Sequence, residues 1–135
     1  MNGPASRGAE GARKSRERKG FMPLESMVYR WDELRLEKVT ELISRKIVTG
    51  DRQMVAQVYL KRGAQVPMHV HESEQLVYVL QGALRYRVGD SEFAIREGDV
   101  LHVPSGIHHQ AEAIEDTFGL VMFSPIREEW LPRSS

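Results

Sequence analysis

The chain has 135 residues, of which 41% are hydrophobic and 28% are charged, and its formal net charge at pH 7 is zero. This length predicts one domain with a sufficient core, and the balanced charge provides no global field that would attract nucleic acid. Cysteine is absent, which excludes disulfides, thiolate metal sites and cysteine nucleophiles. No apolar run reaches the roughly 18 residues of a membrane span, and no apolar signal segment is present, so we expect a cytoplasmic protein.

The first 20 residues differ in composition from the rest of the chain. Residues 1–20 contain six Lys and Arg against two Glu, and Met1 is their only large apolar residue. Such a segment cannot bury enough surface to offset its ordering entropy, so we predict a disordered basic tail. Its run "RKSRERK" lacks aromatic residues, and a solvated tail explains it better than a nucleic-acid-binding arm. Residues 21–135 are predicted to form a single domain.

The segment 31–48 fits both a helical and an alternating apolar period. We predict a short helical turn there, followed by a strand that ends at the turn Thr49–Asp51. Beyond this turn, apolar or alternating runs bounded by Gly, Pro and Asp predict seven further strands, at 54–60, 75–80, 84–88, 93–95, 100–103, 109–113 and 118–123. Short strands with this spacing are typical of a β-sandwich or barrel, and βαβ alternation is absent, so the predicted fold class is all-β.

Three polar residues gather before the run 76–80. His69 and His71 lie one residue apart, so in a strand both side chains point to the same face. Gln75 opens the next predicted strand, close enough for its amide oxygen to act as a third ligand. Two imidazoles and an oxygen suit Zn, Ni, Mn, Fe or Cu better than Ca or Mg.

A second group of histidines follows in "GDVLHVPSGIHHQ", residues 98–110. His108 and His109 occupy adjacent positions with opposite orientations, so only one of them can join the first group. His102 lies on the strand before the Pro-Gly turn. It is a candidate acid or base if it faces the same interior.

The spacing of these residues resembles the two cupin motifs. The stretch 63–82, "GAQVPMHVHESEQLVYVLQG", follows the first motif, and 98–109, "GDVLHVPSGIHH", follows the second. The resemblance implies a jelly-roll β-barrel that holds one divalent transition metal (Zn, Ni, Mn or Fe) inside its mouth. The implied ligands are His69, His71, Gln75 and His109, with His108 facing outward. Gln75 stands where the general motif most often has Glu, so the metal's +2 charge stays uncompensated and favours anionic ligands.

The ending "VMFSPIREEWL", residues 121–131, resembles the C-terminal signature of small cupins that linearise 4,5-unsaturated uronates. This resemblance implies that Phe123 and Arg127 line the substrate site, with Arg127 binding a carboxylate. The catalytic aspartate proposed for that family falls at Val121, which cannot transfer a proton. His102, Tyr78, Tyr86 and Glu74 are the candidates for this role, and Tyr86 is also a candidate for substrate binding.

The leading hypothesis is a metal-dependent enzyme that isomerises, ring-opens or tautomerises a small sugar acid or keto/enol carboxylate. In this hypothesis, His102 or Tyr78 moves protons and Arg127 anchors the substrate. The alternatives are an Fe or Mn oxygenase and a non-catalytic module that binds a small ligand. We expect a small anionic ligand, no nucleic acid or membrane partner, and a homodimer to which residues 28–48 contribute.

Overall fold

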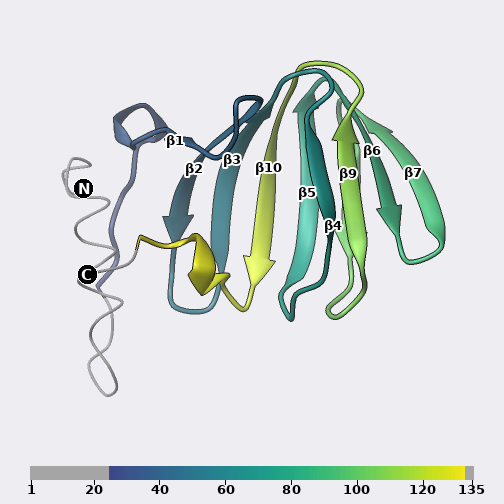
Figure 1. Cartoon of the computed structure of the whole chain (residues 1–135). Helices are drawn as coiled ribbons and strands as arrows, with labels where there is room; N and C mark the ends of the chain where they lie inside the picture. Colours follow the sequence, from purple (N-terminus) through teal and green to yellow (C-terminus); the bar gives the residue numbers. More distant parts are fainter. Residues whose placement is uncertain (1–24, 133–135) are drawn as a thin grey trace.

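The computed structural model describes residues 25–132, in which the chain forms two antiparallel β-sheets (Figure 1). The tail predicted for residues 1–20 lies outside the described residues. The short 3-10 helix η2, Trp31–Glu33, confirms the helical turn predicted before the first long strand. Within residues 25–132, no helix has the length and apolar character needed to cross a membrane.

Ten strands form the two sheets in the described part of the chain. The larger sheet has the order β1-β2-β3-β10-β5-β8, and the smaller one has the order β4-β9-β6-β7. The bounds are β1 Glu37–Lys38, β2 Ile43–Thr49, β3 Met54–Leu60, β4 Gln65–His69, β5 Glu74–Gln81, β6 Ala83–Val88, β7 Ser91–Arg96, β8 Val100–Val103, β9 His109–Ala113 and β10 Thr117–Ser124, followed by the 3-10 helix η3 Glu128–Trp130. Antiparallel pairing of strands as distant in sequence as β3 and β10 confirms the predicted all-β, jelly-roll fold.

The predicted strands agree closely with the structure. All seven strands predicted beyond residue 53 are present, with bounds that differ by at most two residues, and β2 ends at the predicted turn. β1 was not predicted, and β4 corresponds to the strand expected around His69, for which no bounds were predicted. β4 contains Pro67, which suits its place at the edge of the smaller sheet because proline lacks an N–H for a second neighbour.

Side chains alternate between the interior and the outer face, because successive residues of a strand point to opposite sides. Along β3 and β10, fully buried positions alternate with more exposed ones. Inward residues of both sheets form one apolar cluster, in which Val77, Val79 and Leu84 are each at most 3% exposed. The core therefore lies between the two sheets.

Gly82 connects β5 of the larger sheet to β6 of the smaller one. Its φ of +101° lies in the left-handed region that favours glycine. A Cβ at this position would overlap the backbone oxygen of Asp116 and lie 2.8 Å from the Cα of Thr117. This close approach explains why a glycine ends the first motif, and any larger residue would push the two sheets apart at this corner.

Candidate metal centre

Three histidines converge at the end of the sheets where β10 ends and β5 begins (the lower end in Figure 1). His69 ends β4 and lies directly opposite His109, the first residue of β9. His71 lies in the loop after β4, so it reaches the same space from a turn and not from the strand that we predicted. One ring nitrogen from each of His69, His71 and His109 lies within 4.8 Å of the others.

The second nitrogen of each ring defines the tautomer. Each Nδ1 lies 2.8–2.9 Å from a backbone carbonyl oxygen two residues away, and these pairs are His69 with Pro67, His71 with Ser73, and His109 with Ile107. A carbonyl oxygen can only accept a hydrogen bond, so the neutral ring carries its proton on Nδ1. The Nε2 lone pairs therefore point into the shared space, as in metal sites whose histidines are held by backbone carbonyls.

Gln75 completes the set from the opposite sheet. It is the second residue of β5, its side chain is buried, and its Oε1 lies 3.2 Å from Nε2 of His71. Burial lowers the pKa of His71, and the charge of Arg127 lowers it further, so the ring is neutral at pH 7. Two atoms with lone pairs then face each other, an arrangement that a cation between them would stabilise.

His109 shows the clearest sign of a missing partner. Its Nε2 is buried and is the one such side-chain atom without a hydrogen bond among the residues that the structure describes. Burial lowers its pKa to about 4, with smaller contributions from His69, His71 and Arg127. A buried, unpaired and neutral imidazole nitrogen costs stability in the free protein and fits a transition-metal ligand. The donor set of three imidazoles and one amide oxygen thus fits a divalent transition metal.

Arg127 lies beside this neutral donor set. Its side chain is 14% exposed, and both Nε and Nη2 lie 2.9 Å from one oxygen of Glu129. Burial lowers the pKa of Arg127, but the group remains a cation because Glu129 opposes this effect. The guanidinium carbon of Arg127 lies 5.4 Å from the centroid of the Phe123 ring, and this ring packs against His71, so the charge of Arg127 is near the histidines.

An aromatic wall links Arg127 to the histidines. Phe123 is 2% exposed and packs edge-on against His71, with ring centroids 5.7 Å apart. Trp130 packs against Phe123 at 4.9 Å, and the guanidinium of Arg127 lies 5.0 Å from the Trp130 ring. The sequence suggested Glu129 as one candidate partner of Arg127, but it assigned no role to Trp130, although both belong to the ending that resembles the uronate-linearising cupins.

Tyr86 is buried in the interior beside Gln75. Burial raises the pKa of its hydroxyl to about 12, although a hydrogen bond with Gln75 opposes this effect. The side chain is therefore a neutral phenol at pH 7. With 7% of its surface exposed, it offers little surface to a substrate.

Three of the four candidates for proton transfer lie outside the site. His102 faces the outer side of β8, where its Nε2 lies 2.7 Å from Oε2 of Glu74, the first residue of β5. Tyr78 alternates with the buried residues Val77 and Val79, so it also points outward. The structure thus places His102, Tyr78 and Glu74 on the opposite face of the larger sheet from the histidines.

The remaining sequence assignments concern His108 and Val121. His108 is exposed and faces away from the cluster, as the resemblance implied. Val121 is 6% exposed and points into the core one inward position deeper than Phe123. The position of the family's proposed aspartate is therefore part of the interior here, but its valine side chain has no group that can transfer a proton.

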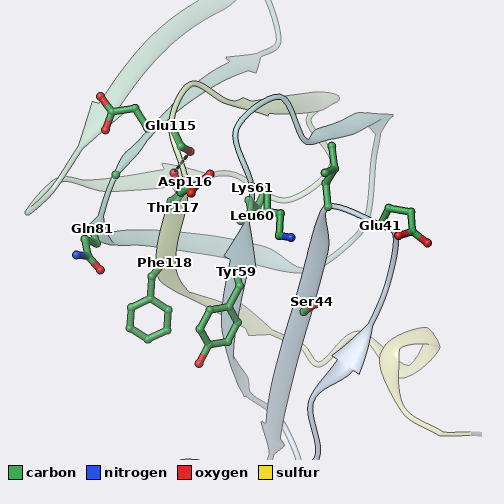
Figure 2. A pocket seen from close by; sticks show the side chains of 12 residues that line it. Glu41, Ser44, Tyr59, Leu60, Lys61, Gln81, Glu115, Asp116, Thr117 and Phe118 are labelled. Carbon is green, nitrogen blue, oxygen red and sulfur yellow. Dashed lines mark hydrogen bonds between the residues drawn. The ribbon is translucent and has the colours of Figure 1, made fainter.

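A separate hollow of about 510 Å³ lies at the other end of the strands (Figure 2). It includes Gln81, the last residue of β5, and the stacked rings of Tyr59 and Phe118, whose centroids are 4.9 Å apart. None of the predicted metal ligands lines it. This hollow is therefore not part of the metal site.

The sequence profile of the Cupin domain family matches residues 56–124, which is just over half of the chain and includes all four predicted ligands. The chain belongs to the cupin family. Among curated relatives, this cupin is 27% identical over 77 residues to the uncharacterized protein MJ1618 of Methanocaldococcus jannaschii. The match covers 56% of the cupin described here and 62% of that relative, which is less than two thirds of its length.

Solved structures show the same family. KdgF from Halomonas sp. is 33% identical to this cupin, with a TM-score of 0.70 over 74% of this chain and 94% of that chain. An RmlC-like cupin from Shewanella frigidimarina has a TM-score of 0.74 at 21% identity, over 78% of this chain and 96% of that chain. The latter similarity establishes a shared fold.

Proposed function

We propose that this cupin binds one divalent transition metal through His69, His71, Gln75 and His109, and that it acts on a small carboxylate. The substrate class is an unsaturated uronate or a keto/enol acid, and the reaction is an isomerisation, ring opening or tautomerisation. The observation that carries this proposal is the convergence of four neutral donors beside the cation Arg127. When bound, the metal supplies a Lewis acid that polarises a hydroxyl or carbonyl oxygen.

Arg127 holds the carboxylate of the ligand in this proposal. Glu129 contacts its Nε and Nη2 through a single oxygen, and no described residue bonds Nη1. A ligand carboxylate can replace Glu129 and take two parallel hydrogen bonds from the guanidinium. The identity to KdgF over most of that chain and the resemblance of the ending to the uronate-linearising cupins support this substrate class.

In this proposal, Glu129 is the carboxylate that moves a proton. Burial acts to raise the pKa of Glu129, but the hydrogen bond and charge of Arg127, which Glu129 contacts, help to lower it. Once a ligand carboxylate occupies Arg127, the oxygens of Glu129 are free to accept a proton from the ligand. This role takes the place of the acid that is absent at Val121.

The test follows the conjugated ultraviolet absorbance of a 4,5-unsaturated uronate incubated with metal-loaded protein. We expect the absorbance to fall faster than with buffer or metal-free protein. Arg127→Gln should raise KM, whereas Glu129→Gln should lower kcat by about 100-fold, the lower range for general acid–base groups. The control Arg87→Gln removes an exposed ion pair with Glu92 and should change neither value. Absence of any acceleration by the metal-loaded wild type would overturn the uronate assignment.

The burial of the apolar Val121 favours one second candidate, a module that binds a small anion without converting it. This candidate predicts that a uronate binds the metal-loaded protein and is recovered unchanged. The oxygenase alternative stays a prediction, and oxygen uptake with enols or diketones tests it.

The homodimer also stays a prediction. The segment 28–48 exposes Val28, Leu36, Val39 and Leu42, each at least 38% accessible in the single chain, and a second subunit could cover them. Sedimentation equilibrium of the purified protein tests this expectation.

A further inference from the structure

The 3-10 helix η3 directly follows Arg127 and contains Glu129, the two charged residues of the proposed ligand site. Within this segment, the N–H groups of Trp130 and Leu131 donate only to carbonyls of the same short turn. A 3-10 helix of this length has poor hydrogen-bond geometry and does not fix its own position. The position of Arg127 therefore depends on side chains that connect η3 to the sheets.

Trp130 makes such a connection. Its ring packs edge-on against Phe123, with centroids 4.9 Å apart, and the guanidinium of Arg45 lies 3.9 Å from its centroid. Arg45 lies on β2 opposite the buried Val58, so it points to the inner side of the larger sheet. Tryptophan is the aromatic residue that attracts a guanidinium most strongly. Arg45 thus holds the Trp130 ring from the strand next to β3.

Arg45 is itself held in a fixed direction. Glu37 lies directly opposite Arg45 on β1, and its two oxygens accept hydrogen bonds from Nε at 2.9 Å and from Nη2 at 3.4 Å. The side chain of Arg45 is only 13% exposed. Because a carboxylate bound in this way lies along the edge of the guanidinium, the flat face stays available for a ring. Glu37 therefore sets the plane on which Trp130 packs.

This arrangement matters most when a ligand is bound. The guanidinium of Arg127 lies 5.0 Å from the ring centroid of Trp130 and 5.4 Å from that of Phe123. In the proposed function, a ligand carboxylate replaces Glu129 on Arg127, and the two rings then still contact the guanidinium. Phe123 is a core residue of β10 at 2% exposure, whereas the position of Trp130 depends on Arg45.

We propose that Arg45 is a positioning residue, which holds the Trp130 ring and thereby keeps Arg127 directed towards the carboxylate of the ligand. This inference rests on the proposed function, in which Arg127 binds that carboxylate. Removing the guanidinium of Arg45 should weaken carboxylate binding and leave metal binding unchanged. The four predicted metal donors come from β4, the loop after it, β5 and β9, and not from β2 or η3.

The test is a double-mutant cycle read as affinity for galacturonate. Dissociation constants are measured by NMR titration, which reaches weak affinities, for the Zn²⁺-loaded wild type, Arg45→Met, Arg127→Gln and the double variant. We expect Arg45→Met to weaken binding by about 3- to 30-fold, as for the loss of one partly buried cation–π contact. On the Arg127→Gln background the same change should alter the affinity by less than about twofold, because the group that Arg45 positions is absent.

A second readout needs no ligand. Nε of Arg127 donates to Glu129 at 2.9 Å, and its Nε–H resonance is identified by its loss in Arg127→Gln. The nearby rings of Phe123 and Trp130 influence this resonance, so we expect it to move in Arg45→Met. Zn²⁺ affinity, measured by competition with a chromophoric chelator, should change by less than about twofold.

Two further variants serve as control and as a milder form of the change. Arg85 lies opposite Glu112 on the neighbouring strand and pairs with it at 3.7 Å, but on the outer face of the smaller sheet. Arg85→Met should alter neither the galacturonate affinity nor the Arg127 resonance. Glu37→Gln removes an exposed charge and should reproduce the effects of Arg45→Met to a smaller extent. It decides the question if Arg45→Met does not fold.

Three results would overturn the proposal. An equal loss of galacturonate affinity on both backgrounds would show that Arg45 supports the fold and does not act through Arg127. No loss on the wild-type background would show that Arg127 keeps its position without Arg45. If the wild type bound no galacturonate, the carboxylate site of the proposed function would fail, and an unchanged Arg127 resonance in Arg45→Met would then overturn this inference as well.

Discussion

The two ends of the interior between the sheets are built on the same strands but differ in chemistry. β5 places Gln75 at the metal end and Val79 four residues further in, and both are buried. β9 likewise runs from His109 to the apolar Ala113. The apolar end is stabilised mainly by the burial of apolar side chains, and its buried Thr117 is hydrogen-bonded to the backbone of Ala83. The metal end contains donors that burial penalises unless a cation or a hydrogen bond pairs them. The strand pattern decides which residues face inward, and their polarity decides what the interior can bind.

The largest expected effect is at the metal end. His109→Ala removes a ligand whose Nε2 has no other partner among the described residues. We expect metal affinity to fall on the order of 1,000-fold, about 4 kcal/mol, since each tenfold change corresponds to about 1.4 kcal/mol. Chelator competition measures this change. Unaltered affinity would mean that the metal, if bound, is not held by this cluster.

The matching change at the apolar end is Leu84→Ala. Leu84 is 3% exposed, and its truncation leaves a cavity between the sheets. The free energy of unfolding should fall by about 3 kcal/mol, within the range for buried leucines. Denaturant titration gives this value, and the metal content per folded chain should stay the same. A parallel loss of metal would show that the two ends are not independent.

The stability of the metal-free protein should depend on pH through the metal end. The pKa of His109 is lowered to about 4 from 6.5, mainly by burial, so folding favours the neutral ring. The stability that this provides is complete above pH 6.5 and is lost as the pH falls towards 4, by roughly 2–3 kcal/mol at about 1.4 kcal/mol per pKa unit. Urea titrations between pH 7 and 4 measure it. His109→Ala should flatten the profile, and an equally steep profile in that variant would contradict the assignment.

A smaller effect tests the neutral charge of the donor set. Gln75→Glu should keep the metal but weaken the binding of a uronate by about tenfold, because the carboxylate offsets part of the metal's charge. Calorimetric titration of metal-loaded wild type and variant with galacturonate compares the two affinities. Tighter binding in the variant would refute the argument that glutamine serves anion binding.

The smallest effect belongs to the outer face. His102→Ala removes an exposed pair with Glu74 on the side of the sheet away from the site. Such pairs contribute about 0–1 kcal/mol, and we expect no change in metal affinity. The same chelator competition applies. A tenfold loss would show that His102 reaches the site after all.

Most of the fold was readable from the sequence because its strands are short, alternate regularly and are separated by Gly and Pro. The orientation of His102 was also readable, since Leu101 and Val103 on either side are apolar and are buried in the structure. The same reasoning applied to Tyr78, which alternates with Val77 and Val79. In both cases, the regular alternation of apolar and polar residues predicts an outward side chain, and this pattern should have excluded the residue as a catalytic candidate.

The packing of the C-terminal segment could not be predicted locally. The guanidinium of Arg45, on β2, lies 3.9 Å from the centroid of the Trp130 ring, although 85 positions separate these residues in the sequence. No periodic pattern encodes a contact between residues that far apart. The tautomers of the histidines could not be predicted either, because they depend on the positions of backbone carbonyls such as those of Pro67 and Ile107.

The central claim is that four neutral side chains hold one metal ion per chain. Anomalous diffraction from crystals grown with Zn²⁺ tests it most directly. We predict one peak per chain, about 2.0–2.2 Å from Nε2 of His69, His71 and His109 and from Oε1 of Gln75, as expected for Zn–N and Zn–O bonds. A peak bound through Nδ1, or one outside this cluster, would contradict the account.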